Sequence, residues 1–122
     1  MTFGNPETLR SLPTMNREEI DALPFGVIKV NDAGVIELFS QFESNLSSVP
    51  IAKAEGRNFF TQVAPCMNNR LIFGRFKEGV VSGEMDATMQ YTLTYKMRPT
   101  NVNLQLYRDP STGTNWVLIQ RR

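Results

Sequence analysis

Two side chains in this sequence could carry chemistry: Cys66, the single cysteine, and the acidic residue Glu43. Cys66 follows Pro65 in a predicted loop shortly before a predicted helix, whose N-terminus favours a thiolate. Because the chain has no histidine to act as a base, this thiol suits covalent attachment of a cofactor better than turnover. The alternative is a buried free cysteine that packs as a small hydrophobic side chain.

Glu43 lies in an aromatic segment, with Phe39 and Phe42 just before it. Most glutamates in such segments are solvated surface charges. If this one is buried instead, desolvation holds its carboxyl neutral and makes it a proton donor. The serines on either side, Ser40 and Ser47, are predicted to cap helices rather than to contact a ligand.

The residue types that are missing exclude most enzyme chemistry. With 0 histidines and 1 cysteine, the chain has no Ser-His-Asp or Cys-His catalysis, no internal disulfide and few means of binding zinc or haem. The acidic residues are scattered, so they do not form the carboxylate cluster that a hard cation needs. We therefore expect neither an enzyme nor a metal protein.

Charge and hydropathy exclude two further classes of partner. The net charge is +1, and no basic stripe suggests binding to nucleic acid. No apolar stretch is long enough to span a membrane, and the N-terminus lacks the features of a signal peptide. Together with the cysteine count, this predicts a cytoplasmic monomer that binds neither nucleic acid nor membrane.

The elements that must position Cys66 and Glu43 fit a single domain of 122 residues. Residues 1–22 contain few apolar side chains and are predicted to form a loosely packed N-terminal cap segment, with a short helix near 17–22. Residues 23–122 are predicted to form the remaining, main part of the domain. Within it, strands are expected at 25–30, 35–39, 89–97, 102–106 and 115–120.

Helices are expected between the second and third of these strands. Short helical turns are predicted at 41–46, 51–54 and 58–62, and one longer connecting helix at 70–82. The side chains predicted on the buried face of the sheet are Tyr91, Tyr95, Met97 and Trp116. The expected fold is α+β, a five-stranded antiparallel sheet with helices over one face, which is by analogy the PAS fold of sensor domains.

Several short motifs around and beyond Cys66 are more specific than the general pattern. They are Gly56-Arg57-Asn58-Phe59-Phe60, Val63-Ala64-Pro65-Cys66, Gly74-Arg75-Phe76-Lys77-Glu78-Gly79-Val80, Tyr91-Thr92, Tyr95, Met97, Pro99-Thr100 and Trp116-Val117. With these motifs the sequence resembles the photoactive yellow protein family of blue-light receptors. The resemblance runs from about residue 23 to residue 121 and is weak over 1–22.

This resemblance implies a PAS fold and p-coumaric (4-hydroxycinnamic) acid bound to Cys66 as a thioester. In the family, a protonated buried Glu and a Tyr donate hydrogen bonds to the chromophore phenolate. Light drives trans-to-cis isomerisation, the Glu gives up its proton, and a partly unfolded signalling state follows in which the N-terminal segment loosens. The proton donor falls on Glu43, a pocket Thr on Ser47, the Met that assists recovery on Met97 and the nearby Tyr on Tyr95.

Four positions depart from the family pattern. The phenolate-binding Tyr falls on Phe39, a shielding Arg on Val49, a Phe of the sheet on Leu93, and an Ala on Phe42. A buried phenolate that loses one charge-assisted hydrogen bond loses roughly 1.5–3 kcal/mol, which raises the phenol pKa by about one to two units. We therefore expect a red-shifted chromophore with a higher pKa, unless Ser47 or a water supplies the missing donor.

Two other functions are compatible with these residues. A chromophore-free PAS module could bind a partner or another small ligand, because Phe39 and Val49 alter the pocket. A thiol enzyme is the third reading, and the absence of histidine weakens it. In the photoreceptor reading, a chain of this length has no room for an output domain, so we expect it to signal through another protein, unknown from the sequence.

Overall fold

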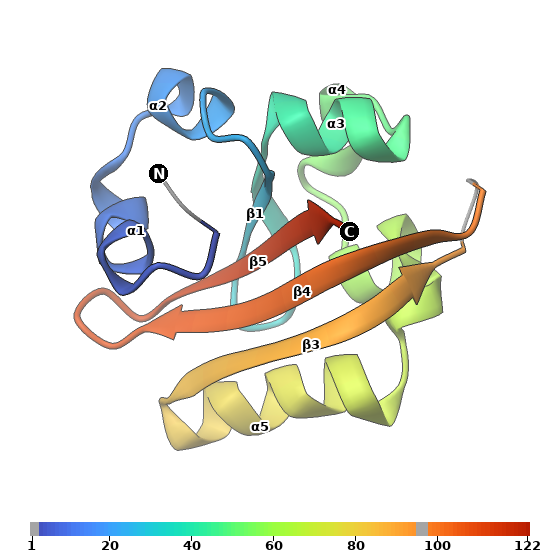
Figure 1. Ribbon diagram of the computed structural model, residues 1–122. Coiled ribbons are helices and arrows are strands. Elements are labelled where there is room, and N and C mark those ends of the chain that lie inside the picture. Colours follow the sequence, from blue (N-terminus) through green and yellow to red (C-terminus); the bar gives the residue numbers. More distant parts are fainter. Residues whose placement is uncertain (1–2, 95–97) are drawn as a thin grey trace.

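The core of the protein is a five-stranded antiparallel sheet with the order β2-β1-β5-β4-β3 (Figure 1). The structure is a computed structural model that describes residues 3–94 and 98–122. The strands are β1 (Gly26–Val30), β2 (Ile36–Phe39), β3 (Met85–Leu93), β4 (Thr100–Asp109) and β5 (Thr114–Arg121). The predicted α+β class with its antiparallel sheet is thus confirmed.

One face of the sheet is covered by the segments between β2 and β3. They are α3 (Gln41–Ser47), α4 (Ile51–Ala54), the π-helical turn η2 (Phe59–Val63), the 3-10 turn η3 (Pro65–Met67), the π-helical turn η4 (Arg70–Gly74) and α5 (Arg75–Ser82). The buried side chains here include Phe59, Phe60 and Phe76 from the helices, with Leu104 and Leu106 from β4. These two leucines alternate with polar or opposite-facing neighbours, as period-2 patterning predicts.

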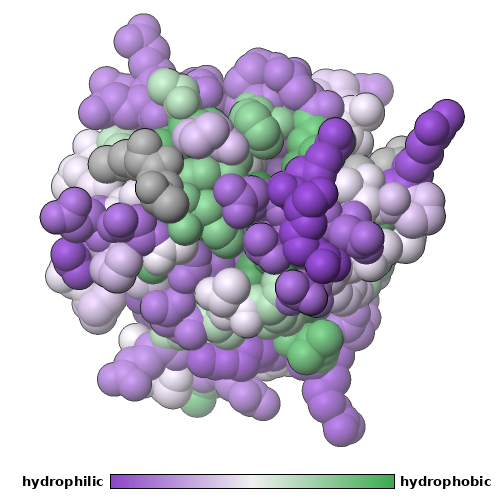
Figure 2. Space-filling model, viewed as in Figure 1, coloured by the Kyte–Doolittle hydropathy of each residue, from purple (hydrophilic) through white to green (hydrophobic). Residues whose placement is uncertain are grey.

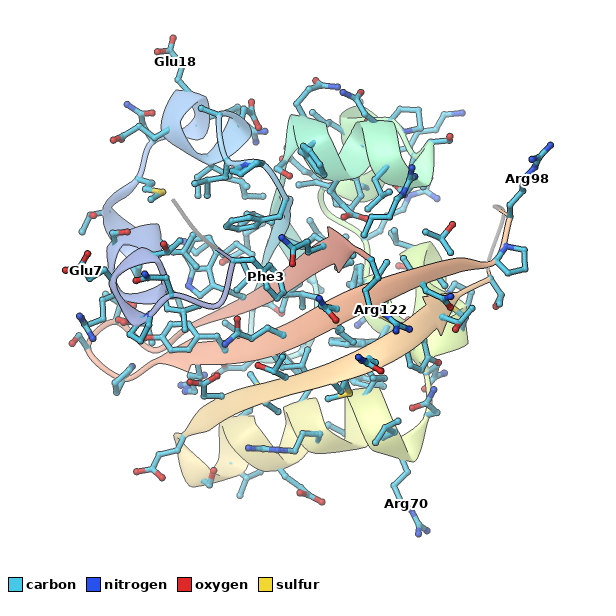
Figure 3. All side chains as sticks on the ribbon, in the orientation of Figure 1. Phe3, Glu7, Glu18, Arg70, Arg98 and Arg122 are labelled. Carbon is cyan, nitrogen blue, oxygen red and sulfur yellow. The ribbon has the colours of Figure 1, made fainter. Side chains whose placement is uncertain are left out.

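The N-terminal segment covers the opposite face, which corrects the expectation of helices on one face only. It forms α1 (Pro6–Ser11), η1 (Leu12–Thr14) and α2 (Arg17–Asp21). Its few apolar side chains, Leu9, Leu12 and Ile20, are all buried against strand residues such as Trp116 and Leu118. The segment is therefore not loosely packed, because nearly every apolar residue in it is used. Figure 3 shows Phe3 pointing inward here, while Glu7 and Glu18 point away.

The predicted ends of the third strand, 89 and 97, were both wrong. Strand β3 already ends at Leu93, and residues 95–97 lie outside the described residues. Strand β3 begins at Met85, four residues before the predicted start at 89, because the alternation continues backwards through the small, weakly apolar Ala87. The helix predicted over 70–82 is divided into η4 and α5, and it ends as expected at Gly83, whose φ of 81° is left-handed. The other predicted strands and helical turns lie within a few residues of the observed ones.

In the orientation of Figure 1, hydrophilic side chains cover much of the surface, and hydrophobic groups show mainly in an area above the centre of the view (Figure 2). Within residues 3–94 and 98–122, no helix has the length and apolar character needed to cross a bilayer.

Candidate functional site

A pocket lies between the helical segments and the sheet, and it brings together most of the predicted site residues. Its lining consists of Phe39, Glu43, Ser47, Val49, Phe59, Val63, Ala64, Cys66, Met67, Leu93 and Ile119. The remaining two predicted residues, Tyr95 and Met97, lie outside the described residues. The pocket encloses about 30 Å³, room for roughly two waters. An aromatic ligand would therefore have to displace some of its walls.

Helix α3 is fastened to β1 at the point where it presents Glu43 to the pocket. Ser40 is the N-cap of α3, and its Oγ accepts hydrogen bonds from Glu43 N at 3.2 Å and from Val27 N at 3.0 Å. Its own backbone N–H donates to Val27 O at 3.0 Å. The prediction of a capping serine is confirmed for Ser40. The cap fixes the first turn of the helix against the sheet, so that Glu43 points inward.

The Glu43 carboxyl is buried, with only 2% of the residue exposed. Its Oε1 has no hydrogen-bond partner among the described residues. Burial raises the pKa of Glu43 to about 8, so the carboxyl carries a proton at neutral pH. The surface-charge alternative is therefore wrong, and the residue is a neutral acid with spare hydrogen-bonding capacity at the wall of a pocket. Such an unpaired group in an apolar site is suited to a polar ligand atom.

Ser47 is oriented toward the backbone of α3. Its Oγ donates to Glu43 O at 2.8 Å and accepts from Val49 N at 3.3 Å. Ser47 is the last residue of α3 and does not cap its N-terminus, so the capping prediction is wrong for this serine. Because its single hydroxyl proton is already engaged, Ser47 can donate to a ligand only by breaking an intrahelical bond.

The three lining positions at which the sequence is expected to depart from the family pattern carry apolar side chains. Phe39 and Leu93 are buried, and Val49 is partly buried, so none of these lining positions offers a side-chain donor. Phe42 is different, because it is 36% exposed and does not line the pocket. Among the described lining residues, polar atoms of side chains come from Glu43, Ser47 and Cys66.

Cys66 lies in η3 and is partly exposed, so it is not the fully buried cysteine of the alternative reading. Its carbonyl oxygen accepts a hydrogen bond from Tyr91 Oη at 2.6 Å and another from Asn69 Nδ2 at 3.1 Å. Asn69 Nδ2 also donates to Tyr91 Oη at 2.9 Å. These contacts hold the backbone of the cysteine turn against β3.

Sequence reasoning missed the role of Asn69 altogether and placed Tyr91 only in the core. The available signal was local: Asn69 precedes an apolar helical run, and its Oδ1 does accept from Ile72 N at 2.9 Å, as an N-cap does. Nothing in that pattern indicates that its Nδ2 reaches back to Cys66 and across to β3. Aromatic packing supports the same region, with Phe60 stacked on Phe73 at a centroid distance of 4.5 Å.

Comparison with known proteins identifies the family of the chain. No family model matches the chain. It is 31% identical over 119 residues to photoactive yellow protein from Rhodothalassium salexigens, across 98% of this chain and 95% of that protein. It is 29% identical over 119 residues to photoactive yellow protein from Halochromatium salexigens, with the same two coverages. Both alignments extend beyond the predicted range of 23–121 into the N-terminal segment.

Solved structures with a similar fold include a photoactive yellow protein domain and other PAS domains. The photoactive yellow protein domain of the sensor histidine kinase Ppr from Rhodospirillum centenum has a TM-score of 0.84 and 36% identity, over 90% of this chain and 96% of that chain. The PAS domain of the Cronobacter turicensis quorum-sensing receptor RpfR, at a TM-score of 0.58 and 10% identity, covers 84% of this chain and 97% of its own, and shows the fold alone. The fold is thus the PAS fold, and the chain belongs to the photoactive yellow protein family.

Proposed function

We propose that this protein is a blue-light photoreceptor that holds p-coumaric acid as a thioester on Cys66. The observation that carries this proposal is that the thiol of Cys66 and the neutral carboxyl of Glu43, whose Oε1 has no partner among the described residues, line one pocket. Bound there, p-coumaric acid supplies visible absorption and a double bond that light isomerises from trans to cis. Residues 23–122 form the chromophore-binding domain in this proposal, and residues 1–22 form its cap.

The chemistry of the lining residues suits such a group, although the pocket walls must move to admit it. Cys66 is partly exposed, so an activated acyl donor can reach it. Glu43 has a proton to donate, and its Oε1 lacks a partner among the described residues. A neutral acid beside a phenolate forms a short, charge-assisted hydrogen bond, which would compensate both buried groups. The apolar remainder of the pocket excludes water from that bond.

Glu43 also supplies the switch. Once it has given up its proton, it is a carboxylate in a pocket where no described residue offers it a partner. Such a buried, unpaired charge is unfavourable by several kcal/mol. Local unfolding of α3, which exposes the carboxylate to water, relieves that cost. The Ser40 cap and its two contacts with Val27 are the bonds that must open first.

The N-terminal cap is bonded to the same stretch of backbone. Arg17 Nη1 donates to Phe39 O at 3.4 Å, and Asp21 Oδ1 accepts from Gln41 N at 2.8 Å. These contacts lie on either side of Ser40, the N-cap of the helix that carries Glu43. Movement of α3 therefore breaks the hydrogen bond between Gln41 and Asp21 directly, which supports release of the N-terminal segment as the output signal. The protein that reads this signal is a downstream partner that we do not identify.

The apolar residue at position 39 tunes the proposed chromophore. With Phe39 in place of a tyrosine and the Ser47 proton engaged by Glu43 O, the phenolate has one donor fewer. Its pKa should be raised by roughly one to two units. Weaker anchoring of the oxygen also delocalises charge toward the other end of the ring, so the absorption band should move to the red.

The second candidate is a chromophore-free PAS module that binds another ligand or a partner. The apolar side chains of Phe39 and Val49 favour it, because they remove polar contacts from the pocket wall. In that case Glu43 would donate its proton to an acceptor on the other ligand. A thiol enzyme has no further support, because no general base for Cys66 lies among the described lining residues.

The test is reconstitution. The purified chain is treated with activated p-coumaric acid, and its mass and visible spectrum are recorded before and after blue light, with Cys66→Ser as the control. A covalent adduct that requires Cys66, absorbs in the visible, bleaches in light and recovers in the dark supports the photoreceptor. Absence of an adduct, or an adduct that light leaves unchanged, supports the chromophore-free module.

A further inference from the structure

The carboxyl of Glu43 rests in a space that a side chain at Gly26 would otherwise fill. An ideal Cβ built on Gly26 lies 2.0 Å from Glu43 Oε1 and 3.1 Å from its carboxyl carbon. The φ of Gly26 is outside the left-handed region, unlike that of Gly34 or Gly83, so the backbone does not require glycine here. Glycine in a strand is destabilising by roughly 0.5–1 kcal/mol relative to alanine. The space that the Glu43 carboxyl occupies beside Gly26 gives a reason for a glycine at this position.

We propose that Gly26 is the positioning residue for Glu43, because its missing side chain forms the notch in β1 that seats the buried carboxyl. Gly26 touches no reacting group of its own and acts through Glu43. Its part in proton donation rests on the proposed function, whereas the seat itself is a property of the protein alone.

The carboxyl of Glu43 has to leave its position to admit a methyl group at Gly26. Real Cβ contacts stay at 3.0 Å or more, so Glu43 Oε1, now at 2.0 Å, would have to withdraw by 3.0 − 2.0 = 1.0 Å. The backbone of α3 is held to β1 by the bonds between Ser40 and Val27, which leaves the side chain to give way. The carboxyl would then no longer occupy the space beside Gly26.

Among the described residues, few other titratable groups face the space that holds the Glu43 carboxyl. The described pocket lining contains Cys66 as its one other titratable side chain. On β1, Lys29 has the opposite orientation, with its Nζ 5.8 Å from the Trp116 ring centroid and 3.9 Å from Glu37 Oε1. The protonation of Glu43 in the chromophore-free protein therefore reports mainly on how deeply the carboxyl is seated.

The test is the pKa of Glu43 in chromophore-free protein, followed by carbon NMR of labelled glutamate carboxyls and assigned with Glu43→Gln. The wild-type pKa is expected near 8, and Gly26→Ala should lower it by about two units as the carboxyl meets water. Gly79→Ala is the matched control, because its added Cβ would lie 2.7 Å from Met85 Cβ, far from any carboxyl seat. It should lower the melting temperature without moving the pKa. An unchanged Glu43 pKa in Gly26→Ala, or an equal shift in Gly79→Ala, overturns the proposal.

A double-mutant cycle covers the case in which Gly26→Ala alone fails to fold. With Glu43→Ala the seat is vacated, and the nearest remaining atom to the new methyl is the Glu43 Cβ position at 3.2 Å. Gly26→Ala should then lower the melting temperature by less than about half of its effect in the wild-type background. Equal losses in both backgrounds would contradict the notch. Since no chromophore is present in either experiment, failure of the photoreceptor proposal leaves these outcomes unaffected.

Discussion

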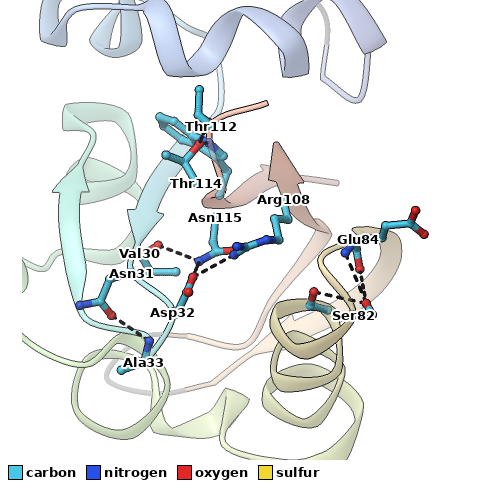
Figure 4. A network of polar contacts seen from close by, with 12 residues as sticks. Val30, Asn31, Asp32, Ala33, Ser82, Glu84, Arg108, Thr112, Thr114 and Asn115 are labelled. Carbon is cyan, nitrogen blue, oxygen red and sulfur yellow. Dashed lines mark hydrogen bonds and ion pairs between the residues drawn. The ribbon is translucent and has the colours of Figure 1, made fainter. Parts of the chain in front are cut away.

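Glu43 and Asp32 are both acidic residues beside the strands of one sheet, and the protein treats them in opposite ways. Asp32 Oδ1 accepts from Arg108 Nη1 at 2.8 Å and from Asn115 Nδ2 at 2.9 Å (Figure 4). Asn115 also donates to Val30 O at 3.3 Å, which joins the β1–β2 hairpin to β4 and β5. Glu43 Oε1, in contrast, has no partner among the described residues.

The difference in partners sets the difference in charge. Hydrogen bonds from Asn115 and then from Arg108 lower the pKa of Asp32, so it remains a carboxylate. Burial without a partner raises the pKa of Glu43 to about 8, so it keeps its proton. The acid with hydrogen-bond donors beside it is therefore charged and links parts of the sheet, whereas the buried acid without such donors keeps its proton.

The largest expected effect of this contrast is the pH dependence of stability through Glu43. Its pKa is about 8 when folded and near 4.5 when unfolded, so its contribution is fully present below pH 4.5 and is lost as pH rises through 8. Over that range the free energy of unfolding falls by about 1.4 kcal/mol per pH unit, or on the order of 5 kcal/mol in total. Urea denaturation of chromophore-free protein measures it, and Glu43→Gln should flatten the profile. A Glu43→Gln protein with the wild-type slope would contradict the assignment of this pH dependence to the protonated Glu43 carboxyl.

The next effect concerns light. In chromophore-loaded Glu43→Gln, no carboxylate can form in the seat, so the several kcal/mol that drive loosening are absent. Hydrogen exchange during illumination should show much weaker loss of protection in α3 and the N-terminal segment than in the wild type. The control is Asp32→Asn, which should loosen like the wild type. Equal loosening in Glu43→Gln and the wild type would remove the buried charge as the cause.

Adding a hydrogen-bond donor to the pocket around Glu43 should make it more similar to the surroundings of Asp32, which contain two donors. In Phe39→Tyr, a hydroxyl beside the proposed phenolate should stabilise it by roughly 1.5–3 kcal/mol. The chromophore pKa should fall by about one to two units, and the band should move to the blue. A pH titration followed in the visible spectrum measures both. A band and a pKa that match the wild type would show that position 39 does not control the oxygen environment.

The sequence predicted which residues line the pocket better than it predicted the contacts that hold these residues in place. Phe39, Glu43, Ser47, Val49 and Cys66 were all expected in one site, because the family motifs fix their places along the chain, and all five line the pocket. The burial of Glu43 was left open, since its local sequence is equally compatible with an exposed helix turn. Only the docking of α3 on β1 decides it.

What could not be predicted depends on contacts between distant segments. The Tyr91 hydroxyl reaches the carbonyl of Cys66, 25 residues earlier, and no periodicity reports which backbone atom a tyrosine will find. The same limit applies to the N-terminal helices, because their second-face packing depends on strand residues such as Trp116 that follow about a hundred positions later. Local propensity predicted the strands and helices themselves, since those depend on neighbours in sequence.

The smallest expected effect is at the satisfied acid. Asp32 has a lowered pKa, so its contribution to stability is present above its ordinary pKa and is lost as pH falls below it. Its side chain is 60% exposed, and exposed ion pairs contribute about 1 kcal/mol or less. Asp32→Asn should therefore cost about that much at neutral pH and nothing in strong acid, measured by the urea midpoint. This pH dependence of stability is opposite in sign to that of Glu43, whose contribution to stability is lost as the pH rises. Asp32→Asn could instead reduce the loss of stability at rising pH that is assigned to Glu43. The protonation of the two acids would then be coupled, and the separate roles given to Asp32 and Glu43 would be wrong.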